Sequence, residues 1–263
     1  RLDNITGGFT NGGMFILAAR PSVGKSAFMG KMVLGAAKSG SHVGIISLEM
    51  ADEQITARLA SLTTETDFWR IYRGRIGDED QSKQFYETMM NKLSHLPVMI
   101  SDTTSVNIGD IKAKVSRLKQ KGNLDILFID YLQLIDTDGN NRNVNREQEV
   151  SKISRGLKLT AMEYDIPIVV LAQLNRASEM AGDKRPKLHH LRESGSLEQD
   201  ADGVIFIHRD FMSGIKVNEQ SVSTESEADI IVSKWRNGEL TEYKIGFDWP
   251  KMKFFEYEER PMY

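Results

Sequence analysis

The sequence predicts one α/β domain over residues 1–263, with a mostly parallel twisted sheet and helices on both of its faces. Short apolar runs, typical of buried strands, alternate with segments whose apolar residues recur every three or four positions, as in an amphipathic helix. After residue 228 short strands follow one another directly, which indicates antiparallel strands at the carboxyl-terminal end. A chain of 263 residues is long enough to bury the core of such a domain.

The first half of the chain alternates between the two patterns. In order, it predicts strand 14–18, helix 27–34, strand 43–48, a helix from about 52, a helix from 78, strand 97–100 and a helix over 108–118. The helix from 52 has Ile55, Leu59 and Leu62 on one face. The helix from 78 begins at Asp78 with Gln81 three residues on, the spacing of a capping box.

The second half continues the alternation and then departs from it. It predicts strand 124–130, helix 150–164, strand 166–171, strand 204–208 and short strands at 230–232, 243–245 and 254–256. Asn237-Gly238 indicates a hairpin between two of the short strands. The polar segments 136–143 and 175–187 are expected to be loops, the first of them mobile.

Composition excludes several classes of protein. Apolar residues make up 40% and charged residues 27% of the chain, which fits a globular and not a disordered protein. There is no cysteine, so a disulfide framework and a thiolate metal site are excluded. No apolar run approaches the ~20 residues of a membrane span, and we expect a cytoplasmic protein without a membrane partner. The net charge of −3 means that any DNA binding must come from a local patch or from an assembly that concentrates such patches.

The segment between the first strand and the first helix has the pattern of a phosphate-binding loop. Backbone N–H groups of such a loop and the helix N-terminus after it converge on phosphate oxygens. Lys25 is expected to reach the β- and γ-phosphates, and the Ser26 hydroxyl to bind Mg²⁺. Ala19 replaces the usual first glycine, and its methyl group is small enough for the loop to form. The alternative is a turn that binds nothing. The predicted loop consists of Ala19, Arg20, Pro21, Ser22, Val23, Gly24, Lys25 and Ser26.

Polar side chains follow three of the other predicted strands. Asp130 ends an apolar strand, where it would hold Mg²⁺ together with the loop hydroxyl; its alternative role is a turn cap. Glu49 is placed to polarise an attacking water, and Gln173 to contact the γ-phosphate. Spacing alone leaves both roles open. A surface glutamate that opens a helix would explain Glu49 equally well, and a solvated glutamine at a strand end would explain Gln173.

Two basic segments are candidates for phosphate contacts. Lys234 and Arg236 share one face of a strand and could stabilise a transferring phosphoryl group, in a neighbouring subunit if they face away from their own loop. In segment 184–196, Arg192, Ser194 and backbone amides could bind a nucleic-acid strand. For both segments, solvated surface charge is the alternative. The adjacent histidines at 189 and 190 lack the spacing of a zinc site.

Taken together, these strings resemble the C-terminal motor domain of DnaB-type replicative helicases, which belong to the RecA-like hexameric motors. The resemblance extends over nearly the whole chain, and Ala19 at the start of the loop is usual in that family. The strings that carry it are Leu2-Asp3 to Thr6-Gly7-Gly8, Ala18-Ala19-Arg20-Pro21-Ser22 to Gly24-Lys25, Ser47-Leu48-Glu49-Met50, Ile129-Asp130-Tyr131-Leu132-Gln133-Leu134, Gln173-Leu174-Asn175-Arg176, Leu191-Arg192-Glu193-Ser194-Gly195-Ser196 to Glu198-Gln199-Asp200-Ala201-Asp202, and Lys234 to Arg236-Asn237-Gly238.

The resemblance implies a RecA-like P-loop NTPase fold and roles for the nucleotide-site residues. Glu49 becomes the catalytic base and Gln173 the sensor of the γ-phosphate, while Arg58 lies near the nucleotide. Lys234 and Arg236 then act across a subunit boundary. The implied activity is that of an ATP hydrolase and DNA helicase in DNA replication, with ATP and Mg²⁺ bound at each junction between subunits.

The resemblance also implies partners. Six copies would form a ring around single-stranded DNA. Arg192, Glu193 and Gly195 match the DNA-contacting loop, and the segment near Arg142 and Arg146 is a second candidate to line the channel. The chain begins with Arg1 and not with methionine, so we expect a piece of a longer protein. The family's N-terminal helical domain and linker would then be absent, and with them the regions through which primase and a helicase loader bind. The rival interpretations are a filament-forming recombinase and a nucleotide-dependent binding module without catalysis.

Overall fold

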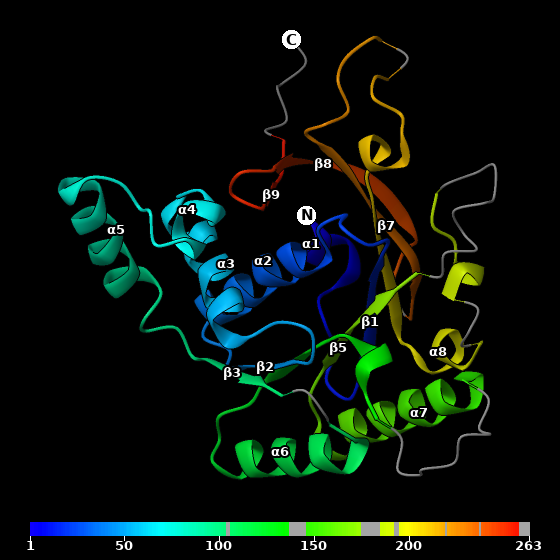
Figure 1. The fold of residues 1–263 in the computed structure, drawn as a ribbon. Coiled ribbons are helices and arrows are strands. Elements are labelled where there is room, and N and C mark those ends of the chain that lie inside the picture. The colour runs from blue at the N-terminus through cyan, green and yellow to red at the C-terminus, as the bar shows by residue number, and fades with distance from the viewer. Residues whose placement is uncertain are drawn as a thin grey trace.

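The strand order of the sheet places six parallel strands together and three antiparallel strands at one side (Figure 1). The computed structural model describes residues 1–103, 106–136, 146–174, 185–191, 195–218, 220–236 and 238–257. Within these residues nine strands form one sheet in the order β3-β2-β4-β5-β1-β6-β7-β8-β9. The strands are β1 (Met14–Ala19), β2 (Val43–Ser47), β3 (Val98–Asp102), β4 (Ile126–Asp130), β5 (Ile168–Gln173), β6 (Gly203–His208), β7 (Glu227–Trp235), β8 (Thr241–Asp248) and β9 (Lys253–Phe255).

Strands β1 to β6 run parallel, and β7, β8 and β9 each pair antiparallel with the strand before them. The predicted fold class is therefore confirmed. The hairpin between β7 and β8 is present as well. Asn237, half of the sequence signal for it, lies outside the described residues.

Two layers of helix cover the sheet. The α-helices are α1 (Leu2–Thr6), α2 (Lys25–Lys38), α3 (Asp52–Thr64), α4 (Phe68–Tyr72), α5 (Glu79–Lys92), α6 (Ile108–Gln120), α7 (Arg146–Tyr164) and α8 (Gly195–Asp200). The 3₁₀ turns are η1 (Leu132–Leu134), η3 (Leu188–Leu191) and η4 (Asp210–Ser213). Helices α2 and α3 lie on one face and α6 and α7 on the other, and α5 projects from the domain (Figure 1).

The central strand β1 explains why its sequence is apolar without alternation. Phe15 and Leu17 belong to the core cluster under α2, whereas Met14, Ile16 and Ala18 belong to the cluster under α7. Successive side chains of a strand point to opposite faces, so a strand covered on both faces must be apolar throughout.

Local sequence explains several helix ends. The Asp78 side chain accepts a hydrogen bond from the N–H of Gln81 at the start of α5, which is one half of the predicted capping box. The Gln81 side chain accepts from Arg70 instead. Asn107 and Asp110 form a capping box at the start of α6. Helices α1 and α4 were not predicted, because five residues are too few for a periodic pattern. The predicted mobile loop at 136–143 lies, from residue 137 on, outside the described residues.

No helix in the described part of the chain is both long enough and apolar enough to cross a bilayer.

Candidate nucleotide-binding site

The carboxyl ends of the parallel strands meet at one edge of the sheet, and a cavity of about 460 Å³ opens there. Predicted and unpredicted side chains share it. The unpredicted ones are Met50 and Gln54 before and on α3, and Trp249 and Met252 between β8 and β9. The full lining is Ala19, Arg20, Pro21, Ser22, Gly24, Lys25, Ser26, Glu49, Met50, Gln54, Arg58, Gln173, Trp249 and Met252.

The phosphate loop joins β1 directly to α2. Gly24 has φ +110°, and a Cβ atom there would lie 2.9 Å from the Phe254 ring, so both backbone and space require glycine. Helix α2 begins at Lys25 and has no acidic residue in its first turn. The first turn of α2 therefore places no carboxylate of its own beside its N–H groups and the positive end of its dipole.

Ser26 and Asp130 lie together, as the sequence predicted. The Ser26 hydroxyl donates a 2.7 Å hydrogen bond to Oδ2 of Asp130, a side chain that is only 1% exposed. The other carboxylate oxygen, Oδ1, is buried without a hydrogen-bond partner and lies 3.9 Å from Lys25 Nζ. A hydroxyl beside a buried carboxylate with an unused oxygen is a donor set that fits Mg²⁺, which prefers oxygen ligands.

Two cations face the cavity at the cost of partial burial. Burial lowers the pKa of Lys25, and the carboxylates of Asp130 and Glu49 act against that shift. Burial likewise lowers the pKa of Arg58, whose guanidinium lies 5.0 Å from the Phe68 ring centroid and whose Nε has no hydrogen-bond partner. An anionic ligand would compensate both desolvated charges.

The loop after β2 fixes the backbone around Glu49. The Ser47 hydroxyl donates to the Met50 carbonyl at 2.6 Å and accepts from the Met50 N–H at 3.1 Å. The Leu48 N–H donates to the Asp130 carbonyl at 2.7 Å and ties this loop to the end of β4. Glu49 itself is exposed and lines the cavity, within electrostatic reach of Lys25.

Gln173 is held by a residue to which the sequence assigned no role. The side-chain amide of Gln133 in η1 donates to the Gln173 carbonyl at 3.0 Å and accepts from the Gln173 N–H at 3.3 Å. The only sequence signal for it was its place two residues after Tyr131 in the family string. Gln133 thus links the segment after Asp130 with the residue that lines the far side of the cavity.

Lys234 and Arg236 do not line this cavity. Because β7 is antiparallel to β6, its end lies beside the start of β6: Trp235 pairs with Gly203, which pairs with Phe15 of β1. The phosphate loop starts at Ala19, four residues further along β1, a separation of about 13 Å at about 3.3 Å per residue. The two cations therefore lie at the opposite edge of the sheet from their own phosphate loop, where the parallel strands β1 and β6 begin.

Both cations are anchored at that edge. Lys234 Nζ donates to the Glu198 carbonyl at 2.5 Å, at the end of α8. Arg236 Nη1 lies 3.0 Å from Oδ1 of Asp202, while 55% of the Arg236 side chain stays exposed. Burial lowers the pKa of Lys234, and Arg236 adds to that effect.

The predicted DNA-contacting residues lie at the limits of the described segments or outside them. Arg142, Arg192 and Glu193 lie outside the described residues, whereas Arg146 and Gly195 begin α7 and α8, with no side chain described for either. These two helices pack together: Ser151 Oγ donates to Ser196 Oγ at 2.8 Å, and Ser154 Oγ donates to Asp200 at 2.8 Å. Both predicted DNA-contacting segments therefore join the described structure at neighbouring helix starts.

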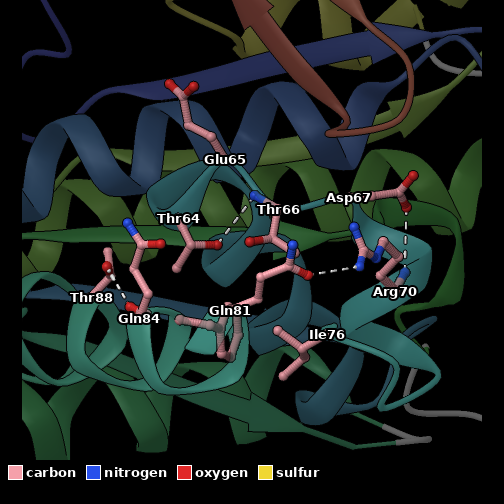
Figure 2. A pocket seen from close by; sticks show the side chains of 10 residues that line it. Thr64, Glu65, Thr66, Asp67, Arg70, Ile76, Gln81, Gln84 and Thr88 are labelled. Atoms are coloured by element: carbon pink, nitrogen blue, oxygen red, sulfur yellow. Dashed lines mark hydrogen bonds between the residues drawn. The ribbon is translucent and has the colours of Figure 1, made fainter. Parts of the chain in front are cut away.

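Two other features of the described residues lie apart from the phosphate loop. A polar cavity of about 280 Å³ lies between α3, α4 and α5, where Arg70 contacts Gln81 (Figure 2). Its lining contains no residue of the phosphate loop, and it includes Asp67, which caps α4. It serves no part of the predicted chemistry.

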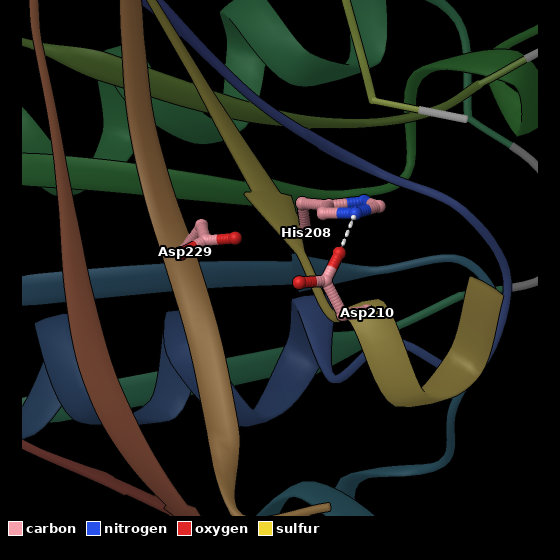
Figure 3. A group of neighbouring side chains, drawn as sticks. All are labelled: His208, Asp210 and Asp229. Atoms are coloured by element: carbon pink, nitrogen blue, oxygen red, sulfur yellow. Dashed lines mark hydrogen bonds and ion pairs between the residues drawn. The ribbon is translucent and has the colours of Figure 1, made fainter. Parts of the chain in front are cut away.

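The second feature is the group of His208, Asp210 and Asp229 near the end of β6 (Figure 3). His208 Nε2 and Asp210 lie 3.0 Å apart, and burial lowers the His208 pKa. The Asp229 carboxylate already faces Arg185 at 2.6 Å and Lys244 at 3.3 Å. Two cations at one carboxylate disfavour a metal ion there, so we assign this group to an ion-pair network.

A parallel sheet with a phosphate loop after β1 and a buried carboxylate at the end of β4 defines a P-loop nucleotide-binding domain of the RecA-like class. Comparisons with known proteins give the family. Residues 1–256 match the model of the DnaB-like helicase C terminal domain. The chain therefore belongs to that family.

Individual relatives agree. The replicative DNA helicase DnaB of Geobacillus stearothermophilus is 40% identical over 260 residues, which cover 98% of this chain and 56% of that protein. The chain thus spans about half the length of such relatives. Among solved structures, the ATPase domain of G40P matches with a TM-score of 0.88 and 31% identity, covering 98% of this chain and 89% of that one. A DnaB-like replicative helicase, described with its interactions with primase, gives the same score and identity over 62% of its chain.

Proposed function

We propose that this chain is the motor domain of a hexameric replicative DNA helicase, which hydrolyses ATP at its subunit junctions to translocate on single-stranded DNA and unwind duplex DNA. The observation that carries the proposal is the opposite placement of two half-sites. The cavity with Lys25, Ser26 and Asp130 lies at one edge of the sheet, and Lys234 with Arg236 at the other. A neighbour in head-to-tail contact can bring the two halves together.

Within the proposed site each residue has a distinct task. Lys25 and the start of α2 bind the phosphates, and Arg58 adds positive charge to the same cavity. Mg²⁺, held by Ser26 and Asp130, would supply charge neutralisation at the phosphates. Glu49 accepts a proton from the attacking water.

The remaining tasks concern the far side of the phosphates. Gln173 contacts the γ-phosphate, and Gln133 keeps its backbone in place. Lys234 and Arg236 of the next subunit stabilise the charge on the transferring group.

DNA binding and partner binding complete the proposal. The segments around Arg192, Glu193 and Gly195, and around Arg142 and Arg146, would face the channel and contact phosphates. Such binding is independent of sequence and weakened by salt. Primase and a helicase loader would bind through regions of the full-length protein beyond this domain.

ATP turnover measured against protein concentration, with and without single-stranded DNA, tests the proposal, with Lys25→Ala as the blank. We expect turnover per subunit to rise with concentration and with DNA. Lys25→Ala and Arg236→Ala should each be inactive alone. Mixed together, they should recover about a quarter of the wild-type rate, because a quarter of random head-to-tail junctions are intact. Absence of turnover in verified hexamers, or no recovery in verified mixed rings, would overturn it.

A further inference from the structure

Lys234 on β7 and Arg236 directly after it, here called the β7 cations, meet the rest of the domain at Asp202. Asp202 follows α8 and precedes β6, and its side chain is 10% exposed. Oδ2 accepts a 2.8 Å hydrogen bond from the Met14 N–H at the start of β1 and a 2.6 Å bond from Lys158 Nζ on α7. Oδ1 faces Arg236 Nη1 at 3.0 Å. One carboxylate therefore joins β1, α7 and Arg236.

The backbone of Arg236 is fixed by the same residue. The Arg236 N–H donates to the Asp202 carbonyl at 2.7 Å, and the Asp202 N–H donates to the Met14 carbonyl at 2.7 Å. A guanidinium has five N–H donors, so an ion pair at one nitrogen leaves further donors with which Arg236 can meet a phosphate. Arg236 is thus anchored at its backbone and at one nitrogen while most of its head remains exposed.

We propose that Asp202 is a positioning residue for Arg236. It fixes the direction in which the guanidinium leaves the subunit, so that Arg236 reaches the neighbouring nucleotide already ordered. An arginine without this anchor would have to lose its rotamer freedom at each catalytic encounter. The inference rests on the proposed function, in which Arg236 completes the site of the next subunit.

Lys158 shares the carboxylate and limits how tightly it holds Arg236. Its Nζ also donates to the Gly12 carbonyl at 2.9 Å, and its side chain is 13% exposed. The negative charge of Asp202 is therefore divided between two cations. Arg236 is oriented by Asp202 and still keeps its charge for the phosphate.

The substitution Asp202→Asn tests this role. The asparagine oxygen can still accept from Met14 and Lys158, but its NH₂ group cannot accept from Arg236. We expect kcat for ATP to fall between about tenfold and a hundredfold, with KM changed less than about twofold, because the subunit's own phosphate-binding cavity is intact. Asp200→Asn is the matched control: it makes the same charge change two residues earlier, where the carboxylate contacts Ser154 and Arg155. It should leave kcat within about twofold.

Mixed hexamers separate positioning from a structural role. An Asp202→Asn subunit keeps its own phosphate loop, and a Lys25→Ala subunit keeps a well-anchored Arg236. Mixing the two should therefore recover about a quarter of the wild-type rate, as about a quarter of the junctions are native. Mixing Asp202→Asn with Arg236→Ala should recover nothing, and the double variant should be no slower than Arg236→Ala alone.

Each failure has its own meaning. Wild-type kcat in Asp202→Asn, or a defect that Lys25→Ala does not rescue, would overturn the positioning role. Failure of the Lys25→Ala and Arg236→Ala pair to recover would overturn the shared site itself. If Asp202→Asn does not fold, as a thermal unfolding scan would show, Asp202→Glu replaces it. That variant keeps the charge, moves the carboxylate by one methylene, and should give a smaller loss with the same pattern of rescue.

Discussion

The side chain of Gln133 takes the place of a strand beside Gln173. The register between β4 and β5 ends at Ile129 and Val170, so β4 does not accompany Gln173 to the cavity. The Gln133 amide instead offers one donor and one acceptor, as a peptide group would, at 3.0 and 3.3 Å. The candidate γ-phosphate sensor is therefore held through its backbone.

Replacing Gln133 with methionine keeps the length of the side chain and removes both hydrogen bonds. Each neutral bond contributes about 1 kcal/mol net, so the pair contributes about 2 kcal/mol. That loss corresponds to an increase of about thirtyfold in local opening at Gln173. The free energy of global unfolding should change less, because Gln133 is half-buried in the three-residue η1 and lies beside an otherwise intact sheet.

Amide hydrogen exchange measures this directly. We expect protection of the Gln173 N–H to fall by about thirtyfold, with the β1 amides unchanged. Gln120→Met on the exposed face of α6 is the control, since that side chain makes one long 3.4 Å bond to Ser116. Unchanged protection at Gln173 would refute the view that Gln133 holds it, and an equal loss across the whole sheet would show global destabilisation instead.

Three further predictions concern the free energy of unfolding, one through core packing and two through its dependence on pH. Gly203→Ala places a Cβ 2.4 Å from the Trp235 ring and should lower the free energy of unfolding by about 1–3 kcal/mol, read by urea denaturation. Burial, with a smaller effect of Glu256, raises the pKa of Tyr243 to about 12. Since the unfolded tyrosine loses its proton near pH 10, stability should fall from pH 10 upward; a 295 nm titration against Tyr243→Phe that shows no component near pH 12 would contradict this. Burial lowers the pKa of His208, and Asp210 opposes that shift. As pH falls through about 6.5, the unfolded state therefore binds a proton before the folded state does. Stability should therefore drop below that pH, and unfolding midpoints at pH 7.5 and 5.5 should differ less in His208→Asn.

The residues that follow parallel strands could be predicted, because topology alone brings them together. Asp130 and Gln173 end parallel strands, and Lys25 and Glu49 follow two others; all four lie where the carboxyl ends of these strands meet. The parallel strands themselves could also be predicted. Helices cover both of their faces, so these strands are apolar throughout and stand out in the sequence.

The rest of the site depends on contacts between distant segments. Gln54 and Trp249 reach the cavity only because α3 and the turn after β8 approach it in the folded chain. Gln133 acts through a side-chain amide, and its place in a family segment of the sequence does not reveal that contact. Spacing placed Lys234 and Arg236 on one face but could not choose the edge of the sheet, because that choice depends on β7 running antiparallel to β6.

The cavity and the β7 cations lie at opposite edges of one sheet, so under the proposed function the two surfaces that meet at each junction are different. A row of n copies that does not close then has n − 1 complete sites, with a cavity lacking its cations at one end. Opening a ring to admit a DNA strand would create that same unmatched cavity at the gap. Nucleotide bound there would persist until the ring closes, which ties turnover of the last site to enclosure of the strand.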